Sequence, residues 1–195
     1  VSNIVFMGQG EPLINMKNLK TAIQILKDKR GLNYGNKKIT VSTSGIANKI
    51  KEAADEIGTY LALSLHAPND ELREKIMPIN RKFKINELVK QLKYYTSVVK
   101  EPIFLEYVML KGINDTEECA KQLVKLMSKF PSKVNLIEFN SWPGVKFQPT
   151  ERQEIEKFSK FIKDKGYMSF IRRSRGDDVL AACGQLRTES EKKNI

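Results

Sequence analysis

The chain has 195 residues, of which 34 are lysine or arginine and 23 are aspartate or glutamate, so its formal net charge at pH 7 is +11. Hydrophobic residues make up 41% and charged residues 29% of the chain, which is enough apolar material for a core and excludes a disordered chain. No apolar run approaches the ~18 residues needed to cross a bilayer, and no signal-peptide pattern is present. We therefore expect a cytoplasmic protein with no membrane partner.

The reactive residue types are scarce. Two cysteines, Cys119 and Cys183, exclude a disulfide scaffold and indicate a reducing compartment. A single histidine, His66, excludes a zinc site built from several histidines. The excess positive charge indicates a polyanionic partner. Because the chain begins with Val1 and enters a strand-like run at Ile4–Met7 almost at once, we expect a fragment or a processed form of a longer protein.

Apolar, β-rich runs alternate with segments of helical spacing. The runs predict six strands, at residues 4–7, 38–42, 60–65, 103–110, 134–139 and 168–171. Between them, four segments repeat apolar residues as one face of a helix would: Leu19, Ile23 and Leu26; Leu88, Leu92 and Tyr95; Ala120, Leu123 and Met127; Ile155, Phe158 and Ile162. Strand alternating with helix is typical of a parallel α/β fold, because parallel neighbours need a crossover connection.

Two helix starts carry the spacing of a capping box. Asp115 with Glu118, and Thr150 with Gln153, place a capping side chain three residues before an acidic or amide side chain. The spacing predicts that each pair caps the helix that follows it.

Polar or glycine-rich clusters follow every predicted strand. They lie at residues 8–12, 42–45, 66–70, 111–114, 140–144 and 172–176. An open sheet would concentrate its site at one switch point, whereas barrel enzymes assemble a site from many loops at the C-terminal ends of their strands. We therefore predict an incomplete TIM-like (β/α) barrel over residues 1–187, followed by a polar tail at 188–195.

The first two clusters suit the binding of a small ligand. The glycines of Gly8–Pro12 let the backbone approach a ligand closely, and Glu11 could accept hydrogen bonds from an ammonium group; the alternative is an ordinary turn with a solvated glutamate. The hydroxyls of Ser42–Gly45 suit a carboxylate or phosphate at a helix N-terminus, although a plain N-cap explains them as well.

The remaining candidates are single residues and one basic run. His66 is more typical of a structural hydrogen-bonding residue than of an acid–base catalyst, because no second histidine accompanies it. Asn140 offers both a donor and an acceptor at a strand end. Cys183 lies between small residues and near arginines that would favour its thiolate, whereas Cys119 fits a buried helix face. The basic run 172–175, with Lys82 and Lys84, could contact phosphates.

Several short segments of the sequence, taken in this order, resemble the motifs of one protein family over residues 3–187. The resemblance rests on the following segments: Met7-Gly8-Gln9-Gly10-Glu11-Pro12, Ser42-Thr43-Ser44-Gly45, Ser64-Leu65-His66-Ala67-Pro68-Asn69-Asp70, Glu106-Tyr107-Val108-Met109-Leu110, Asn135-Leu136-Ile137 and Arg175-Gly176-Asp177-Asp178 through Cys183-Gly184-Gln185-Leu186. Together they are similar to the radical-SAM 23S rRNA (adenine-C2)-methyltransferases of the RlmN type.

The resemblance implies a radical-SAM barrel that uses S-adenosylmethionine and a [4Fe-4S] cluster to methylate carbon 2 of an adenosine in 23S rRNA and in some tRNAs. It implies that Cys183 carries the methyl group as a methylcysteine intermediate. It also implies S-adenosylmethionine contacts from Gly10, Glu11, Ser42, Ser64, Leu65, His66 and Asn140. An electron donor for the cluster would be a further partner, and we expect a monomer.

One element of the family pattern is absent. The cluster-binding C-x-x-x-C-x-x-C on the loop after the first barrel strand does not occur in the sequence, so we predict that this strand and loop are missing and that the chain holds no metal. Three thiolates are needed to hold the cluster, so the chain alone should be inactive. Two alternatives stay open: the related family that methylates carbon 8 of the same adenosine, and a non-catalytic basic RNA-binding module.

Overall fold

A computed structural model describes residues 1–8, 10–141 and 145–172. In these residues one sheet contains the strands β1 (Ile4–Phe6), β2 (Ile39–Thr43), β3 (Tyr60–Ser64), β4 (Ile103–Met109), β5 (Ser132–Glu138) and β6 (Ser169–Arg172). The helices are α1 (Met16–Lys27), α2 (Ala47–Glu56), α3 (Asp70–Ile76), α4 (Ile85–Val99), α5 (Glu117–Met127) and α6 (Arg152–Asp164), with short 3-10 helices η1 (Pro12–Asn15), η2 (Asn36–Lys38) and η3 (Pro78–Arg81).

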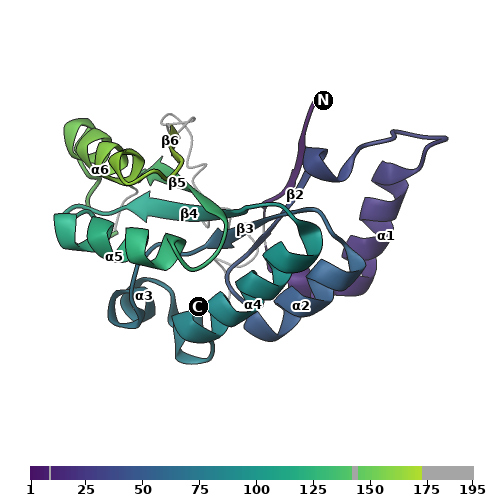
Figure 1. Ribbon diagram of the computed structural model, residues 1–195, viewed down its shortest axis with the longest axis horizontal. Coiled ribbons are helices and arrows are strands. Elements are labelled where there is room, and N and C mark those ends of the chain that lie inside the picture. Colours follow the sequence, from purple (N-terminus) through teal and green to yellow (C-terminus); the bar gives the residue numbers. More distant parts are fainter. Residues whose placement is uncertain (9, 142–144, 173–195) are drawn as a thin grey trace, which may run out of the picture.

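All neighbouring strands are parallel, and their order in the sheet is their order in the chain. Figure 1 shows the sheet as a curve with the helices along its outside, the chain start and β6 at the two ends of the curve, and β3 and β4 between them. The predicted parallel α/β fold is confirmed, and each predicted strand lies within two residues of an observed one. The predicted tail at 188–195 lies outside the described residues.

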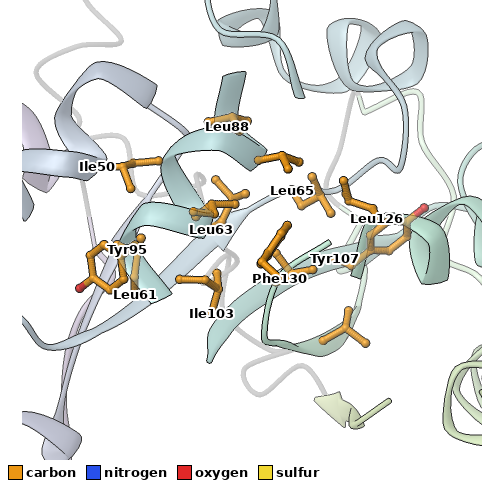
Figure 2. Packing of buried hydrophobic residues seen from close by; sticks show 14 of the residues in the cluster. Ile50, Leu61, Leu63, Leu65, Leu88, Tyr95, Ile103, Tyr107, Leu126 and Phe130 are labelled. Carbon is orange, nitrogen blue, oxygen red and sulfur yellow. The ribbon is translucent and has the colours of Figure 1, made fainter. Parts of the chain in front are cut away.

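Alternation along each strand separates two faces. Leu61 and Leu63 of β3 and Leu105 and Tyr107 of β4 are at most 1% exposed and belong to the core between sheet and helices. Figure 2 shows Leu61, Leu63 and Tyr107 gathered with side chains of α2, α4 and α5, among them Ile50, Leu88 and Leu126. Because successive side chains of a strand point to opposite faces, the residues between them face the inside of the curve. That inner face carries the polar residues Ser64, Glu106 and Asn135 beside apolar ones such as Ala62 and Phe104.

The four predicted helical stripes lie on α1, α4, α5 and α6, and their residues are buried or packed against the core. The helix start expected after Ser42–Gly45 is found, since α2 begins at Ala47, although no apolar stripe was predicted for it; α3 was not predicted. Cys119 is 5% exposed on α5, as its predicted structural role requires. None of the described helices is long and apolar enough to span a membrane.

Both predicted helix caps are wrong. The cap of α5 is Thr116, whose hydroxyl oxygen accepts a hydrogen bond from the Cys119 backbone N–H at 3.2 Å. The residue before α6 is Glu151, which makes no side-chain cap bond. Asp115 and Thr150 instead bond to each other, with the Thr150 hydroxyl donating to Asp115 Oδ2 at 2.9 Å. Each of these two residues therefore bonds to a residue far away in the sequence and does not cap the helix that follows it.

Candidate functional site

The loops after β1 and β2 are joined through one carboxylate. Glu11 Oε2 accepts hydrogen bonds from both the backbone N–H and the hydroxyl of Ser44, each at 2.7 Å. Its Oε1 accepts from the backbone N–H of Leu13 at 3.2 Å, at the start of η1. A carboxylate has about four acceptor positions, so Glu11 retains room for one further donor while it holds the two loops together.

Next to Glu11, the backbone of Gly10 has a φ of +79°, in the left-handed region that favours glycine. A Cβ atom added at Gly10 would meet no atom within 4 Å. The glycine is therefore required by the backbone turn, and its α-carbon borders open space. This is the exposed backbone that the sequence predicts beside Glu11.

The hydroxyls of the Ser42–Gly45 segment are engaged within the fold. Ser42 Oγ donates to the carbonyl oxygen of Phe6 at 2.8 Å, which links β2 to β1. Thr43 Oγ1 accepts from the backbone N–H groups of Gly45 and Ile46 at 3.0 and 3.4 Å. With Ser44 bound to Glu11, these hydroxyls fix the shape of the loop. The alternative N-cap interpretation is wrong, because the N-cap of α2 is Ile46 and no side chain caps that helix.

A buried arginine that the sequence analysis did not single out binds the backbone at the ends of β2 and β3. Arg73 of α3 is fully buried, and its guanidinium donates to the carbonyl oxygens of Leu65 at 3.2 Å, Ser64 at 3.1 Å and Ser44 at 2.7 Å. A fourth bond goes to Asn80 Oδ1 at 3.0 Å. Burial lowers the pKa of Arg73 to about 10, against a smaller opposing effect of Asp70, so it stays charged at pH 7.

Gly45 makes this arrangement possible. A Cβ atom there would lie 3.0 Å from Arg73 Nη2, and the backbone has a φ of +106°. In the sequence, Arg73 stands in the charged segment Asp70–Ile76, which looks like a solvated helix. Only the tertiary contacts reveal its role.

His66 is held as a neutral imidazole. Its backbone is left-handed, with a φ of 56°, and its Nδ1 accepts a hydrogen bond from the Val108 backbone N–H at 3.1 Å. Burial, and then the positive charge of Arg73, lower the pKa of His66 to about 4. With Nδ1 an acceptor, the ring hydrogen is on Nε2, which makes His66 a neutral donor. This agrees with the expectation that it does not act as an acid–base catalyst.

Asn114 fixes the backbone of His66. Its Nδ2 donates to the carbonyl oxygens of His66 at 2.8 Å and Val108 at 2.7 Å, and its Oδ1 accepts from the Leu110 backbone N–H at 2.7 Å. The Asn114 side chain is fully buried. Its own carbonyl oxygen accepts from the Tyr107 hydroxyl at 2.7 Å, so the end of β3 is locked to the end of β4.

The other predicted site residues differ in how they can contribute. Ser64 lies on the inner face and is half-buried. Leu65 points into the core at 1% exposure, and its N–H and carbonyl oxygen are already bonded to Glu106 and Arg73. Asn140 lies just beyond β5, half-buried. Cys183 lies outside the described residues.

The described part of the chain contains no cluster of three histidine, cysteine or acidic residues that could hold a metal ion. Of the basic residues singled out in the sequence, Lys84 pairs with Glu74 at 2.7 Å and Lys82 lies over the Phe83 ring. Arg172 lies at the end of β6, 55% exposed, whereas residues 173–175 are outside the described ranges.

Comparison with known proteins agrees with this arrangement. The chain is 50% identical over 98% of its length to the "Dual-specificity RNA methyltransferase RlmN" of Sinorhizobium fredii and to that of Agrobacterium fabrum, covering 47% of each. It thus spans about half the length of these curated relatives. A radical SAM methyltransferase structure from Sphaerobacter thermophilus superposes with a TM-score of 0.90 at 39% identity, over 96% of this chain and 55% of that one.

A domain of a pyruvate-formate lyase-activating enzyme from Bacteroides vulgatus shares the fold alone, with a TM-score of 0.65 at 16% identity, over 88% of this chain and 99% of that one. The pattern that defines the radical SAM superfamily matches residues 2–124, more than half of the sequence. The chain therefore belongs to the radical SAM superfamily.

Proposed function

We propose that this chain forms part of a radical S-adenosylmethionine methyltransferase that methylates carbon 2 of adenosine in 23S rRNA and tRNA. The observation that carries the proposal is the 50% identity to dual-specificity RNA methyltransferases across 98% of the chain. The geometry supports it, since the family's ligand motifs lie on loops that Glu11, Arg73 and Asn114 tie together at one end of the sheet.

The described residues fit S-adenosylmethionine. Gly10 borders open space, Glu11 retains acceptor capacity for the methionyl ammonium group, and His66 is a neutral N–H donor. Ser42 and Leu65 serve through the loop shape that they maintain. In the proposed site, Ser64 and Asn140 supply polar side chains along the ligand.

A [4Fe-4S] cluster does not fit the residues present. The sequence has two cysteines, of which Cys119 is buried on α5, and three thiolates are needed. The reductive chemistry that the cluster supplies therefore requires ligands that this chain does not contain. An electron donor would be a partner of the holoenzyme, and the chain alone is expected to be inactive.

Cys183 is proposed as the methyl carrier on the strength of its motif. Its thiolate sulfur forms a bond to the methyl carbon of S-adenosylmethionine, and the bond from that carbon to the sulfonium sulfur breaks, with its electron pair leaving on S-adenosylhomocysteine. Carbon 2 of adenine is electron-poor and does not attack that methyl directly, which is why a carrier sulfur is needed. The net charge of +11 suits an RNA substrate. We propose a cytoplasmic monomer.

The test is mass spectrometry of the Cys183 peptide from the full-length protein that carries this chain, isolated from cells. We expect an added methyl group on Cys183, loss of RNA methylation in Cys183→Ala with unchanged iron content, and full activity in the matched control Cys119→Ala. Nucleoside analysis should find 2-methyladenosine; 8-methyladenosine would instead assign the carbon-8 family. A peptide that is never methylated, together with an active Cys183→Ala variant, would overturn the proposal.

A further inference from the structure

One nitrogen of Arg73 joins strands β2 and β3 at the point where their backbone pairing stops. The register of the two strands ends with Thr43 opposite Leu63, so Ser44 and Ser64 would form the next pair. Arg73 Nη2 donates to the carbonyl oxygens of both serines, at 2.7 Å and 3.1 Å. The buried guanidinium of α3 therefore bridges the two strands one residue beyond their last backbone pair.

This bridge continues into the loop after β1. Ser44, whose carbonyl oxygen Arg73 holds, donates its N–H and its hydroxyl to Glu11 Oε2, each at 2.7 Å. Its chain neighbour Gly45 turns away from the sheet with a φ of +106°. Hydrogen-bond networks of this kind can carry energetic coupling between distant groups. Because Ser44 is bonded on both sides, a displacement of Arg73 should also displace the carboxylate of Glu11.

A second nitrogen of Arg73 fixes the peptide unit between Leu65 and His66. Arg73 Nε donates to the Leu65 carbonyl oxygen at 3.2 Å, and the His66 N–H of the same unit donates to the carbonyl oxygen of Glu106 at 3.2 Å. A peptide unit is planar, so bonds at both of its ends fix its tilt. This tilt sets the direction in which His66, with its left-handed φ of 56°, leaves the end of β3.

Arg73 acts on any ligand through the residues that it holds. It is fully buried, and each of its three side-chain nitrogens donates to an acceptor of the fold, the remaining one, Nη1, to Asn80 Oδ1 at 3.0 Å. These acceptors lie in different segments of the chain. The planar fork of donors therefore sets where the end of β2 and the end of β3 lie relative to each other.

We propose that Arg73 is a positioning residue that couples the two ends of the S-adenosylmethionine site, Glu11 after β1 and His66 after β3. The inference rests on the proposed function, which makes these two residues ligand contacts. With the fork of Arg73 in place, both ends are ordered before the ligand arrives. Without it the ligand has to order them on binding, and this ordering lowers its affinity.

The first measurement is the affinity of the full-length, cluster-reconstituted protein for S-adenosylhomocysteine, by calorimetry well below the unfolding temperature of each variant. Arg73→Lys keeps the charge but cannot present the planar fork, so it should bind about tenfold more weakly than the wild type. Arg81→Lys is the matched control, because that side chain is 74% exposed, and it should bind as the wild type does. A folded Arg73→Lys variant with wild-type affinity would contradict the proposal.

The second measurement needs no ligand. NMR of the full-length protein with labelled histidine follows the imidazole of His66, which is identified by its absence in His66→Gln. Glu11→Gln should shift this resonance when Arg73 is present, because the change passes through Ser44 and Arg73, and should leave it unmoved in Arg73→Lys. If Arg73→Lys does not fold, Ser44→Ala removes only one bond to Glu11 and should shift His66 as well.

A His66 resonance that ignores Glu11→Gln in the otherwise wild-type protein would overturn the coupling. A resonance that shifts equally with and without Arg73 would show that the coupling takes another route and would also overturn it. Failure of the wild type to bind S-adenosylhomocysteine would count against the proposed function instead, and the response of His66 would still decide the role of Arg73.

Discussion

Arg73 Nη2 donates a hydrogen bond to the carbonyl oxygen of Ser44 at 2.7 Å, so a side chain of α3 holds the end of β2. The same guanidinium bonds the carbonyl oxygens of Ser64 and Leu65 at the end of β3. Main-chain carbonyl oxygens carry only partial charge, and no ion pair of Arg73 is found among the described residues. The buried charge is therefore balanced by oriented backbone dipoles, and its removal should be felt at both strand ends.

Arg73→Met should lower the free energy of unfolding by about 3 kcal/mol or more, because the carbonyl oxygens that it serves would be left buried without donors. Arg73→Lys keeps the charge but cannot present the planar fork of donors, so it should recover only part of the loss. Urea unfolding followed by circular dichroism measures both. Arg30→Met is the control, since that side chain is 92% exposed and its change should stay within about 0.5 kcal/mol. Equal effects at Arg73 and Arg30 would contradict the role of Arg73.

His66 should titrate well below the usual histidine range. Its pKa is lowered from 6.5 to about 4 by burial and by Arg73, so the unfolded state binds more protons than the folded state between these two values. Stability should therefore fall as the pH is lowered from 6.5 towards 4, and this contribution should be constant above 6.5. NMR of the single imidazole of an untagged chain measures the pKa, and His66→Gln should remove this part of the pH dependence. A midpoint near 6.5 would rule out the buried, neutral state.

Asn114→Ala should destabilise the protein by about 2–4 kcal/mol, since it removes three side-chain hydrogen bonds and leaves buried groups of His66, Val108 and Leu110 unpaired. Amide hydrogen exchange should also accelerate locally at Leu110. The matched control is Asn18→Ala, which removes only an exposed bond to Asn15. Unchanged protection of the Leu110 amide in a folded Asn114→Ala variant would show that this clamp is not needed.

Asp115 and Thr150 should show a measurable coupling in a double-mutant cycle. The cycle compares Asp115→Asn, Thr150→Val and the double variant by denaturant unfolding. A hydrogen bond between a carboxylate and a hydroxyl at 2.9 Å should give an interaction energy of about 1 kcal/mol. Strictly additive effects would mean that each residue acts alone, as two independent helix caps would.

The strands could be predicted from the sequence because each is a short β-rich run, although Val5 of β1 and Phe170 of β6 are exposed and do not face the core. The helices with a continuous apolar stripe, such as the one formed by Leu88, Leu92 and Tyr95, could be predicted from that stripe. Helix α2 lacks such a stripe, since it buries Ile50 together with the small residues Ala53 and Ala54. Small residues give little hydrophobic contrast, which is why only the start of this helix, after Ser42–Gly45, could be predicted and not its apolar face.

Part of the candidate site could be predicted from the sequence. The motif residues Gly10, Glu11 and His66 do lie at strand ends, but Glu11 is bonded to Ser44 and His66 to Asn114, both far away in sequence. Arg73 in turn bonds the carbonyl oxygen of Ser44. The capping pattern at Asp115 and Thr150 failed because the two residues, 35 positions apart, satisfy each other. The spacing of residues along the chain predicts local structure, such as a helix cap. Which distant polar residues bond to each other depends on how the whole chain packs. The methyl-carrier role of Cys183 stays a prediction.

The order of the strands has a consequence for how this sheet can be assembled. Each strand lies beside the one made just before it, so β2 finds β1 already present, and β6 finds β5. A chain that emerges N-terminus first from the ribosome can therefore add one strand and its covering helix at a time. No completed pair of strands has to open to admit a later one. The sheet can grow at a single advancing edge at the pace of translation.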